Sequence, residues 1–91
     1  MKRTFTYEFE DDGHNRITYE YSPEEDERLE VLIQDGQCFV AANRSGLLTL
    51  ARILIKMAYG NYDSGFHVHL RKDFDGEKEE ILVPVLLDDK A

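Results

Sequence analysis

The sequence predicts one α+β domain over residues 1–91, with a mainly antiparallel sheet of about six strands and one long helix across one face. The expected element order is β-β-β-β-α-β-β. Three observations predict this fold. Short segments alternate apolar and polar residues, turn residues separate them at hairpin spacing, and one longer segment has apolar residues at helical spacing.

The first two strands are predicted at residues 3–10 and 16–21. In both segments, aromatic or apolar residues alternate with Thr, Glu and Arg. The intervening DDGHN has the composition of a turn, so the two segments form a hairpin. In the register that closes this turn Phe9 faces Ile17, and Glu10 faces Arg16, so apolar meets apolar and acid meets base.

A second hairpin is predicted from RLEVLIQ (28–34) and QCFVAAN (37–43), joined by a two-residue turn at Asp35-Gly36. This turn sets a register whose apolar or small pairs share one face, which we expect to face the core. The pairs are Ile33 with Cys38, Val31 with Val40, and Leu29 with Ala42.

A helix over residues 23–34 is the alternative for the first half of this region. Ser22 as cap, Pro23 at the first position and Glu25 resemble a helix start. Leu29, Leu32 and Ile33 would then form its apolar face. The six matched side chains of the hairpin register favour the hairpin, with residues 23–27 as at most one helical turn.

The long helix is predicted from a cap at Asn43 to a stop at Gly60. Its core-facing stripe is expected to comprise Leu47, Leu50, Ala51, Leu54, Met57 and Ala58. Leu48 and Ile55 widen this stripe, and Ile53 lies off it. The polar strip is Thr49, Arg52, Lys56 and Tyr59.

The last two strands are predicted in GFHVHLR (65–71) and EILVPVLL (80–87). In the first, Phe66, Val68 and Leu70 are expected inward, and His67, His69 and Arg71 outward. Pro84 lacks the N–H that a ladder needs, which indicates an edge position or a strand end.

The charge balance restricts the classes of partner. Nineteen acidic residues against eleven basic ones give a formal net charge of −8. This charge repels nucleic acid and anionic membranes, and it attracts basic proteins. The N-terminus lacks the apolar run of a signal peptide, the single cysteine excludes an internal disulfide, and no stretch reaches membrane-spanning length. We therefore expect a cytoplasmic protein that binds neither nucleic acid nor membrane.

His67 and His69 are the residues whose pattern is closest to a chemical site. On a strand they share one face, about 6.6–6.8 Å apart, a spacing that can chelate zinc. A zinc site needs a third protein ligand, and the sequence indicates none, because Cys38 is expected in the core. Carboxylates are abundant but no spacing singles out a catalytic pair. We predict no metal, no cofactor and no enzyme, with a metal-dependent enzyme through the two histidines as the alternative.

The remaining feature is a surface. In the second hairpin Leu32 and Phe39 face each other on the side opposite the core, among Thr, Glu and His. An exposed apolar pair of this kind can anchor a protein partner.

The segment FVAANRSGLLTLARILIKMA, followed by GFHVHL, resembles the immunity protein 32 family of bacterial polymorphic toxin systems. The resemblance rests on the helix start Asn43–Gly46–Leu47–Leu48, the Leu50–Ala51 pair, the strand with Gly65, His67, His69 and Leu70, and the acidic-Gly loop before EEILVPV. It implies a protein that binds and neutralises a cognate toxin.

Together the charge and the resemblance predict that the outer sheet face contacts the toxin. The residues are Glu8, Glu20, Glu30, Leu32, Phe39, His67 and His69. A basic nuclease is the toxin class that such an acidic face fits. The alternative is a non-catalytic homodimer or accessory module. It would associate through the helix flank of Leu48, Ile53 and Ile55, or through the strand edge at Pro84.

Overall fold

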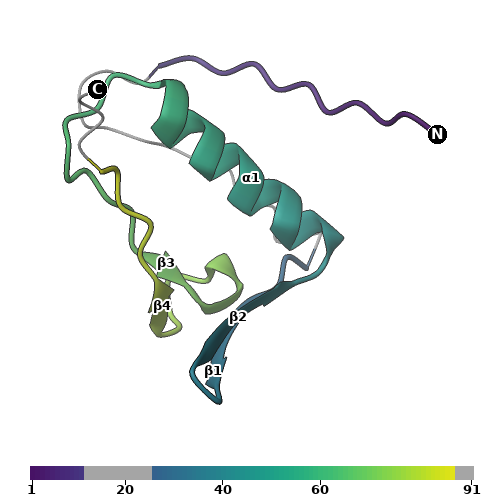
Figure 1. The fold of residues 1–91 in the computed structure, drawn as a ribbon, viewed down its shortest axis with the longest axis vertical. Helices are drawn as coiled ribbons and strands as arrows, with labels where there is room; N and C mark the ends of the chain where they lie inside the picture. The colour runs from purple at the N-terminus through teal and green to yellow at the C-terminus, as the bar shows by residue number, and fades with distance from the viewer. Residues whose placement is uncertain (12–25, 88–91) are drawn as a thin grey trace.

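The computed structural model describes residues 1–11 and 26–87. Within these residues the elements are β1 (Leu29–Gln34), β2 (Gln37–Ala42), α1 (Arg44–Tyr59), β3 (Leu70–Arg71), a 3-10 turn (Lys72–Phe74) and β4 (Glu80–Leu82). The strands form two antiparallel pairs, β1 with β2 and β3 with β4 (Figure 1). The α+β class with one helix is confirmed. The expected sheet of about six strands is wrong, because four strands in two separate sheets are present in the described part of the chain.

The first predicted hairpin is not present as expected. Residues 1–11 contain no strand, although the chain there is extended (Figure 1). Its predicted partner at 16–21 lies outside the described residues. The alternation of Phe5, Tyr7 and Phe9 still has a structural counterpart, because their rings follow one another along the segment. The Phe5 and Tyr7 centroids are 6.5 Å apart with tilted planes, and the Tyr7 and Phe9 rings stack at 5.8 Å.

The second hairpin is confirmed in full register. Ile33 pairs with Cys38, Val31 with Val40, and Leu29 with Ala42. Asp35 and Gly36 have φ of 52° and 77°, the two positive values that a tight turn of this kind requires. The alternative helix is therefore wrong for residues 29–34, while residues 23–25 lie outside the described chain.

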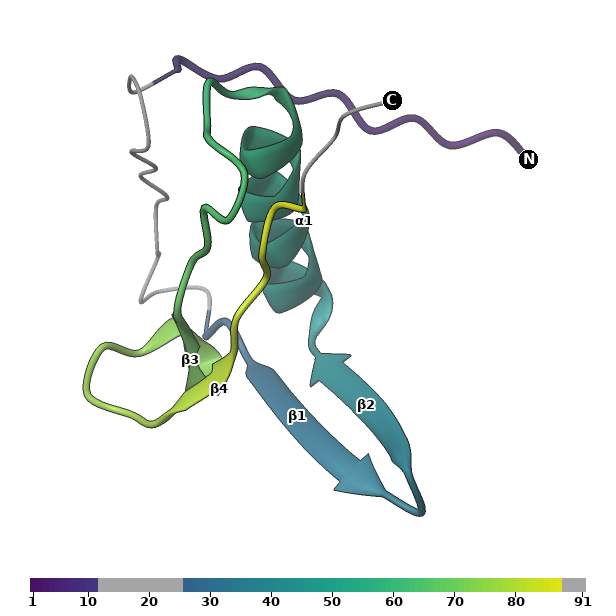
Figure 2. The same cartoon turned by 60° about the vertical axis from the view of Figure 1, so that its left-hand side comes forward.

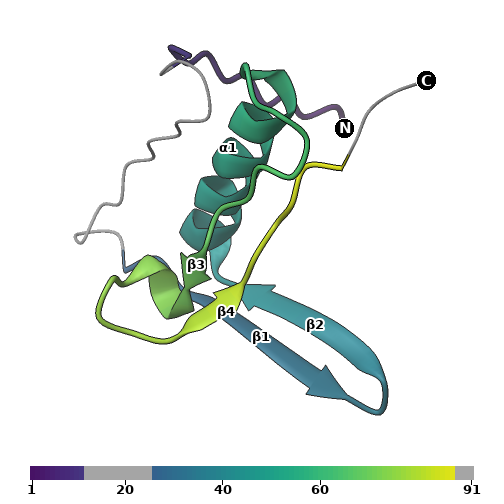
Figure 3. The same ribbon diagram turned by 90° about the vertical axis from the view of Figure 1, so that its left-hand side faces the viewer.

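The expected burial of this hairpin is wrong over most of its length. Leu29 is fully buried and Ala42 half-buried, but Ile33 and Val40 are 79% and 44% exposed, and Cys38 is exposed as well. Figures 2 and 3 show the reason, because the hairpin extends away from the base of α1 rather than beneath it. The helix covers the base of the hairpin and leaves its tip uncovered.

Helix α1 has the predicted ends. The side chain of Asn43 caps it by accepting a hydrogen bond from the Gly46 N–H, and Gly60 follows its last residue. Position 46 also requires glycine, because a Cβ there would collide with the carbonyl oxygen of Arg28. The helix lacks the length and apolarity for a membrane span, and no other helix in the described residues has them.

The buried face of α1 differs from the predicted stripe. Gly46, Thr49, Ile53 and Met57 are buried, whereas Leu47, Leu48 and Leu54 are exposed. Thr49 is buried because its hydroxyl donates a 2.7 Å hydrogen bond to Glu27 Oε2, which is buried too. Ile53 is fully buried, so a homodimer contact through Ile53 is wrong.

The two C-terminal segments form strands that are shorter than the predicted 65–71 and 80–87, because the regular ladder is limited to β3 and β4, which pair antiparallel. Phe66, Val68 and Leu70 point inward, while His67, His69 and Arg71 are exposed. β4 ends at Leu82, two residues before Pro84, which cannot donate to the ladder. Pro84 nevertheless accepts a hydrogen bond from the Val68 N–H at 3.2 Å, and one isolated bridge joins His67 to Val85.

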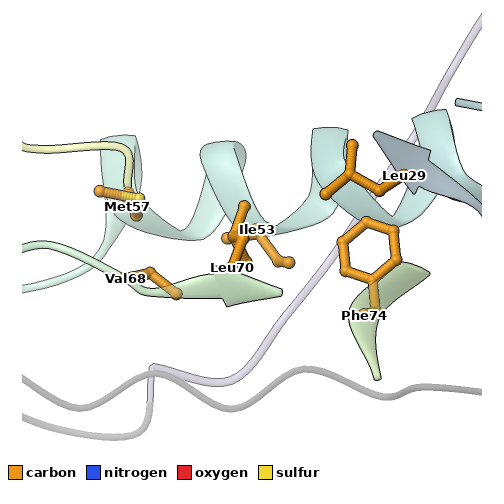
Figure 4. Packing of buried hydrophobic residues seen from close by; sticks show 6 residues of the cluster. All are labelled: Leu29, Ile53, Met57, Val68, Leu70 and Phe74. Atoms are coloured by element: carbon orange, nitrogen blue, oxygen red, sulfur yellow. The ribbon is translucent and has the colours of Figure 1, made fainter. Parts of the chain in front are cut away.

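The core lies between α1 and the two strand pairs (Figure 4). Ile53 and Met57 supply the helix side. Strand and loop residues supply the other side, namely Leu29, Val68, Leu70 and Phe74. Because this core is small, more large hydrophobic side chains are exposed than buried among the described residues.

Candidate partner-binding surface

Asn43 joins the base of the β1–β2 hairpin to the start of α1. Its Oδ1 accepts hydrogen bonds from the backbone N–H groups of Arg28 and Gly46, both at 2.9 Å. Its Nδ2 donates to the carbonyl oxygen of Asp26 at 2.7 Å. One side chain thus holds the segment before β1 against the helix, which fixes the direction in which the hairpin leaves the core.

Asp73 fixes the same base from the other side. It has a φ of 55°, in the left-handed region that Asp tolerates better than most residues. Its Oδ1 accepts a 2.9 Å hydrogen bond from the buried N–H of Leu29, and its Oδ2 accepts one from Lys78 Nζ at 2.9 Å. The Lys78 and Leu29 hydrogen bonds hold the pKa of the Asp73 carboxyl below its ordinary value despite its burial, helped by the charges of Lys78 and Arg28.

The anchored hairpin exposes apolar side chains on both faces. Leu32 and Phe39 pair across the strands, 51% and 46% exposed. Ile33 and Val40 are exposed on the opposite face. A two-stranded hairpin is marginally stable alone and a strand edge invites pairing, so such a projecting element is suited to contact with another protein.

The predicted outer-face residues are partly brought together. Leu32 and Phe39 are direct neighbours, and Glu30 lies on the same side of β1, with Oε1 3.8 Å from Lys72 Nζ. His67 and His69 belong to the separate β3–β4 region. Glu8 lies apart, in a groove beside Tyr59, and Glu20 falls outside the described residues.

The two histidines have ring centroids 4.8 Å apart, with one ring edge toward the other. His69 Nδ1 lies 2.8 Å from Glu80 Oε1, at the first residue of β4. His67 Nδ1 lies 3.0 Å from the carbonyl oxygen of Gly65. Across residues 1–11 and 26–87, no three His, Cys, Asp or Glu side chains are arranged to hold a metal ion.

Four residues that shape this surface were not predicted from the sequence. Ile33 and Val40 were assigned to the core, and Asp73 and Glu27 were given no role. The turn at Asp35-Gly36 is a signal for the first two, because residues beside a tight turn lie at the far end of a hairpin. No sequence signal links Asp73 to Leu29, which precedes it by 44 positions.

A family model described as Immunity protein 32 matches residues 39–87, which is more than half of the chain. The matched segment contains most of β2 and all of α1, β3 and β4, and with them Phe39, His67 and His69. No curated protein and no solved structure matches the sequence significantly.

Proposed function

Because the chain belongs to the immunity protein 32 family, we propose that it binds a cognate bacterial toxin in the cytoplasm and neutralises it without catalysing a reaction. The observation that carries this proposal is the β1–β2 hairpin. It projects from the core with Leu32 and Phe39 about half exposed, and its base is tied to the rest of the fold by Asn43 and Asp73.

Leu32 and Phe39 are the anchors in this proposal. A paired aromatic and aliphatic side chain on a fixed element gives a partner a large apolar contact at little cost in conformational entropy. Phe39 also lies within the family match. The contact that we propose with the toxin also includes Glu30, on the same side of β1 as Leu32, and the more distant Glu8, His67 and His69. Glu20, outside the described residues, belongs to the proposal as well.

A basic toxin, such as a nuclease, fits the charge of the chain. Nucleases bind phosphates through cationic clefts, and a protein with a net charge of −8 is attracted to such a cleft. The hairpin itself carries Glu30 and Asp35 and no basic residue. Long-range attraction would then speed association, while the apolar anchors would slow dissociation.

The test uses the toxin encoded beside this protein, co-expressed in a bacterial host with growth as the readout. Wild type is expected to restore growth, and the double variant Leu32→Ser/Phe39→Ser to fail. Truncating two anchors should weaken binding of the purified toxin by at least about 100-fold in calorimetry. The matched control is Leu54→Ser, an equally exposed leucine on α1, which should protect as wild type does.

Two outcomes would count against the proposal in different ways. Full protection by the double variant would remove the hairpin as the binding element. Absence of protection by wild type would remove this toxin as the partner.

Raising NaCl from about 50 mM to about 500 mM should lower the association rate at least about tenfold if the partner is basic. A salt-independent rate would exclude a basic partner surface.

A further inference from the structure

The N-terminal segment is extended over residues 1–10, and within the described part of the chain these residues belong to no strand pair. Phe5, Tyr7 and Phe9 lie along one side, as alternate residues of a strand do, and the Tyr7 and Phe9 rings are stacked. No backbone hydrogen bond joins residues 1–10 to another part of the described chain. A strand with free N–H and C=O groups is a template for pairing with another strand.

One side of this segment already rests on the helix. The guanidinium of Arg52 lies 5.9 Å from the centroid of the Tyr7 ring, within the range of a cation–π contact. At its C-terminal end, Asp11 Oδ2 accepts a hydrogen bond from the Asn61 N–H at 3.0 Å. The other end extends away from the helix (Figures 1 and 2), and Phe5 remains 49% exposed.

A groove of about 560 Å³ lies between this segment and α1. Its lining is mainly apolar and aromatic: Phe5, Tyr7, Glu8, Phe9, Ile55 and Tyr59. The groove therefore has room for further aromatic rings beside those of the segment itself.

The sequence of this segment is complementary to itself when two copies are aligned antiparallel with Tyr7 of one copy opposite Tyr7 of the other. Arg3 then faces Asp11, and Phe5 faces Phe9, on the side that rests on the helix. On the other side, Thr4 faces Glu10 and Thr6 faces Glu8. This register places opposite charges at both ends, aromatic pairs in the middle and no like charges directly opposite.

We propose that residues 3–11 pair with the same residues of a second copy as an antiparallel two-stranded ribbon, with Tyr7 on the twofold axis. A twofold axis perpendicular to the ribbon keeps both aromatic sides on the same face. Both α1 helices then lie against that face, and the aromatic side chains of each copy enter the groove of the other. The ribbon lies apart from the β1–β2 hairpin that we propose for the toxin and shares only Glu8 with the wider toxin surface.

Sedimentation velocity on the full chain tests this proposal. Wild type is expected to form dimers at about 100 µM and to dissociate on dilution. Arg3→Glu alone places two acid–acid contacts in each dimer, and Asp11→Lys alone places two base–base contacts. Each variant is expected to raise the dimer dissociation constant at least about tenfold.

Mixing the two variants gives the decisive result. In the mixed dimer, the new Glu at position 3 faces the new Lys at position 11, and the unchanged Arg3 faces the unchanged Asp11. Dimerisation should therefore return to the wild-type level. The matched control is Glu10→Lys, which makes the same charge change opposite an uncharged Thr4 and should dimerise within about threefold of wild type.

If the N-terminal segment instead pairs with residues 16–21 of its own chain, as the sequence predicted, mixing the variants should give a different result. The register of that hairpin places Arg3 opposite Pro23 and Asp11 opposite Asn15, so mixing the variants would rescue nothing. A wild-type chain that stays monomeric, or variants that dimerise normally, would overturn the proposal. So would a failure of the mixture to recover.

A crosslink gives an independent readout. In a Cys38→Ser background, Tyr7→Cys places two thiols opposite each other across the axis, within the reach of a disulfide. Mild oxidation should give a covalent dimer, whereas Glu8→Cys should not, because Glu8 faces Thr6. Equal crosslinking of both variants would contradict the register.

Discussion

Replacement of Asp73 tests how the base of the hairpin is held. Asp73→Ala removes the acceptor of the buried Leu29 N–H and the partner of Lys78 Nζ, each at 2.9 Å. It also places alanine at a φ of 55°, which Asp and Asn adopt more readily. Asp73→Asn keeps a side-chain oxygen for Leu29 and tolerates the same φ, but it loses the charge.

The two variants should differ clearly in stability. A buried N–H left without an acceptor costs about 1–3 kcal/mol. The left-handed conformation adds about 1 kcal/mol for alanine. We expect Asp73→Ala to lower the free energy of unfolding by about 3 kcal/mol. For Asp73→Asn we expect about 1 kcal/mol, because a charge-assisted hydrogen bond becomes a neutral one.

Acid titration separates the charge from the hydrogen bond. The pKa of Asp73 is lowered from 3.8, so the stability that its charge contributes is fully present above that pH. This contribution is lost as the pH falls through the folded-state pKa. The stability difference between wild type and Asp73→Asn should be constant near neutral pH and shrink in acid.

For Lys78 the dependence of stability on pH is reversed, because the hydrogen bond to Asp73 raises the Lys78 pKa above 10.5. Its contribution is present below that pH and is lost as the pH rises through the folded-state pKa. Urea unfolding followed by circular dichroism measures each difference, with the exposed Glu77→Gln as the control. Equal losses for Asp73→Ala and Asp73→Asn would refute the role assigned to the Leu29 hydrogen bond, and a loss with Glu77→Gln would show a general charge effect.

Two further predictions concern the start of α1. Gly46→Ala would stabilise an unobstructed helix, but here it should destabilise the fold by about 2 kcal/mol, because its Cβ meets the carbonyl oxygen of Arg28. Gly76→Ala, which has open space around it, should change thermal stability by less than about 1 kcal/mol, and a stabilising Gly46→Ala would contradict the close approach. Asn43→Ala should cost about 2 kcal/mol in urea unfolding, since it loses the cap and both contacts with residues 26–28. Asn43→Asp keeps the cap and loses the donor to Asp26, so it should cost about half as much, and equal costs would refute the capping role.

The candidate site was predictable in its local parts. The Leu32–Phe39 pair followed from the turn, and the exposure of His67 and His69 followed from strand alternation. The isolation of Glu8 from this pair was not predictable, because one continuous sheet was expected to carry them both. The exposure of Ile33 and Val40 was missed for the same reason.

By itself, the sequence determined the elements whose causes are local. The Asp35-Gly36 turn set the hairpin register, and the Asn43 cap and Gly60 stop set the helix ends. Turn and cap geometry depend on neighbouring residues, so a reading of nearby positions suffices.

The tertiary structure decided which surfaces are covered. Nearly every side of α1 carries an apolar residue, so periodicity could not separate Ile53 in the core from Leu54 in solvent. Burial of Thr49 depended on Glu27, which lies 22 positions earlier in the chain. The hairpin tip was exposed because the contacts that Asn43 and Asp73 make with distant backbone direct it away from the helix. Which side chains are buried depends on groups that are far apart in sequence. These groups contact one another only in the folded chain, so local patterns do not reveal their packing.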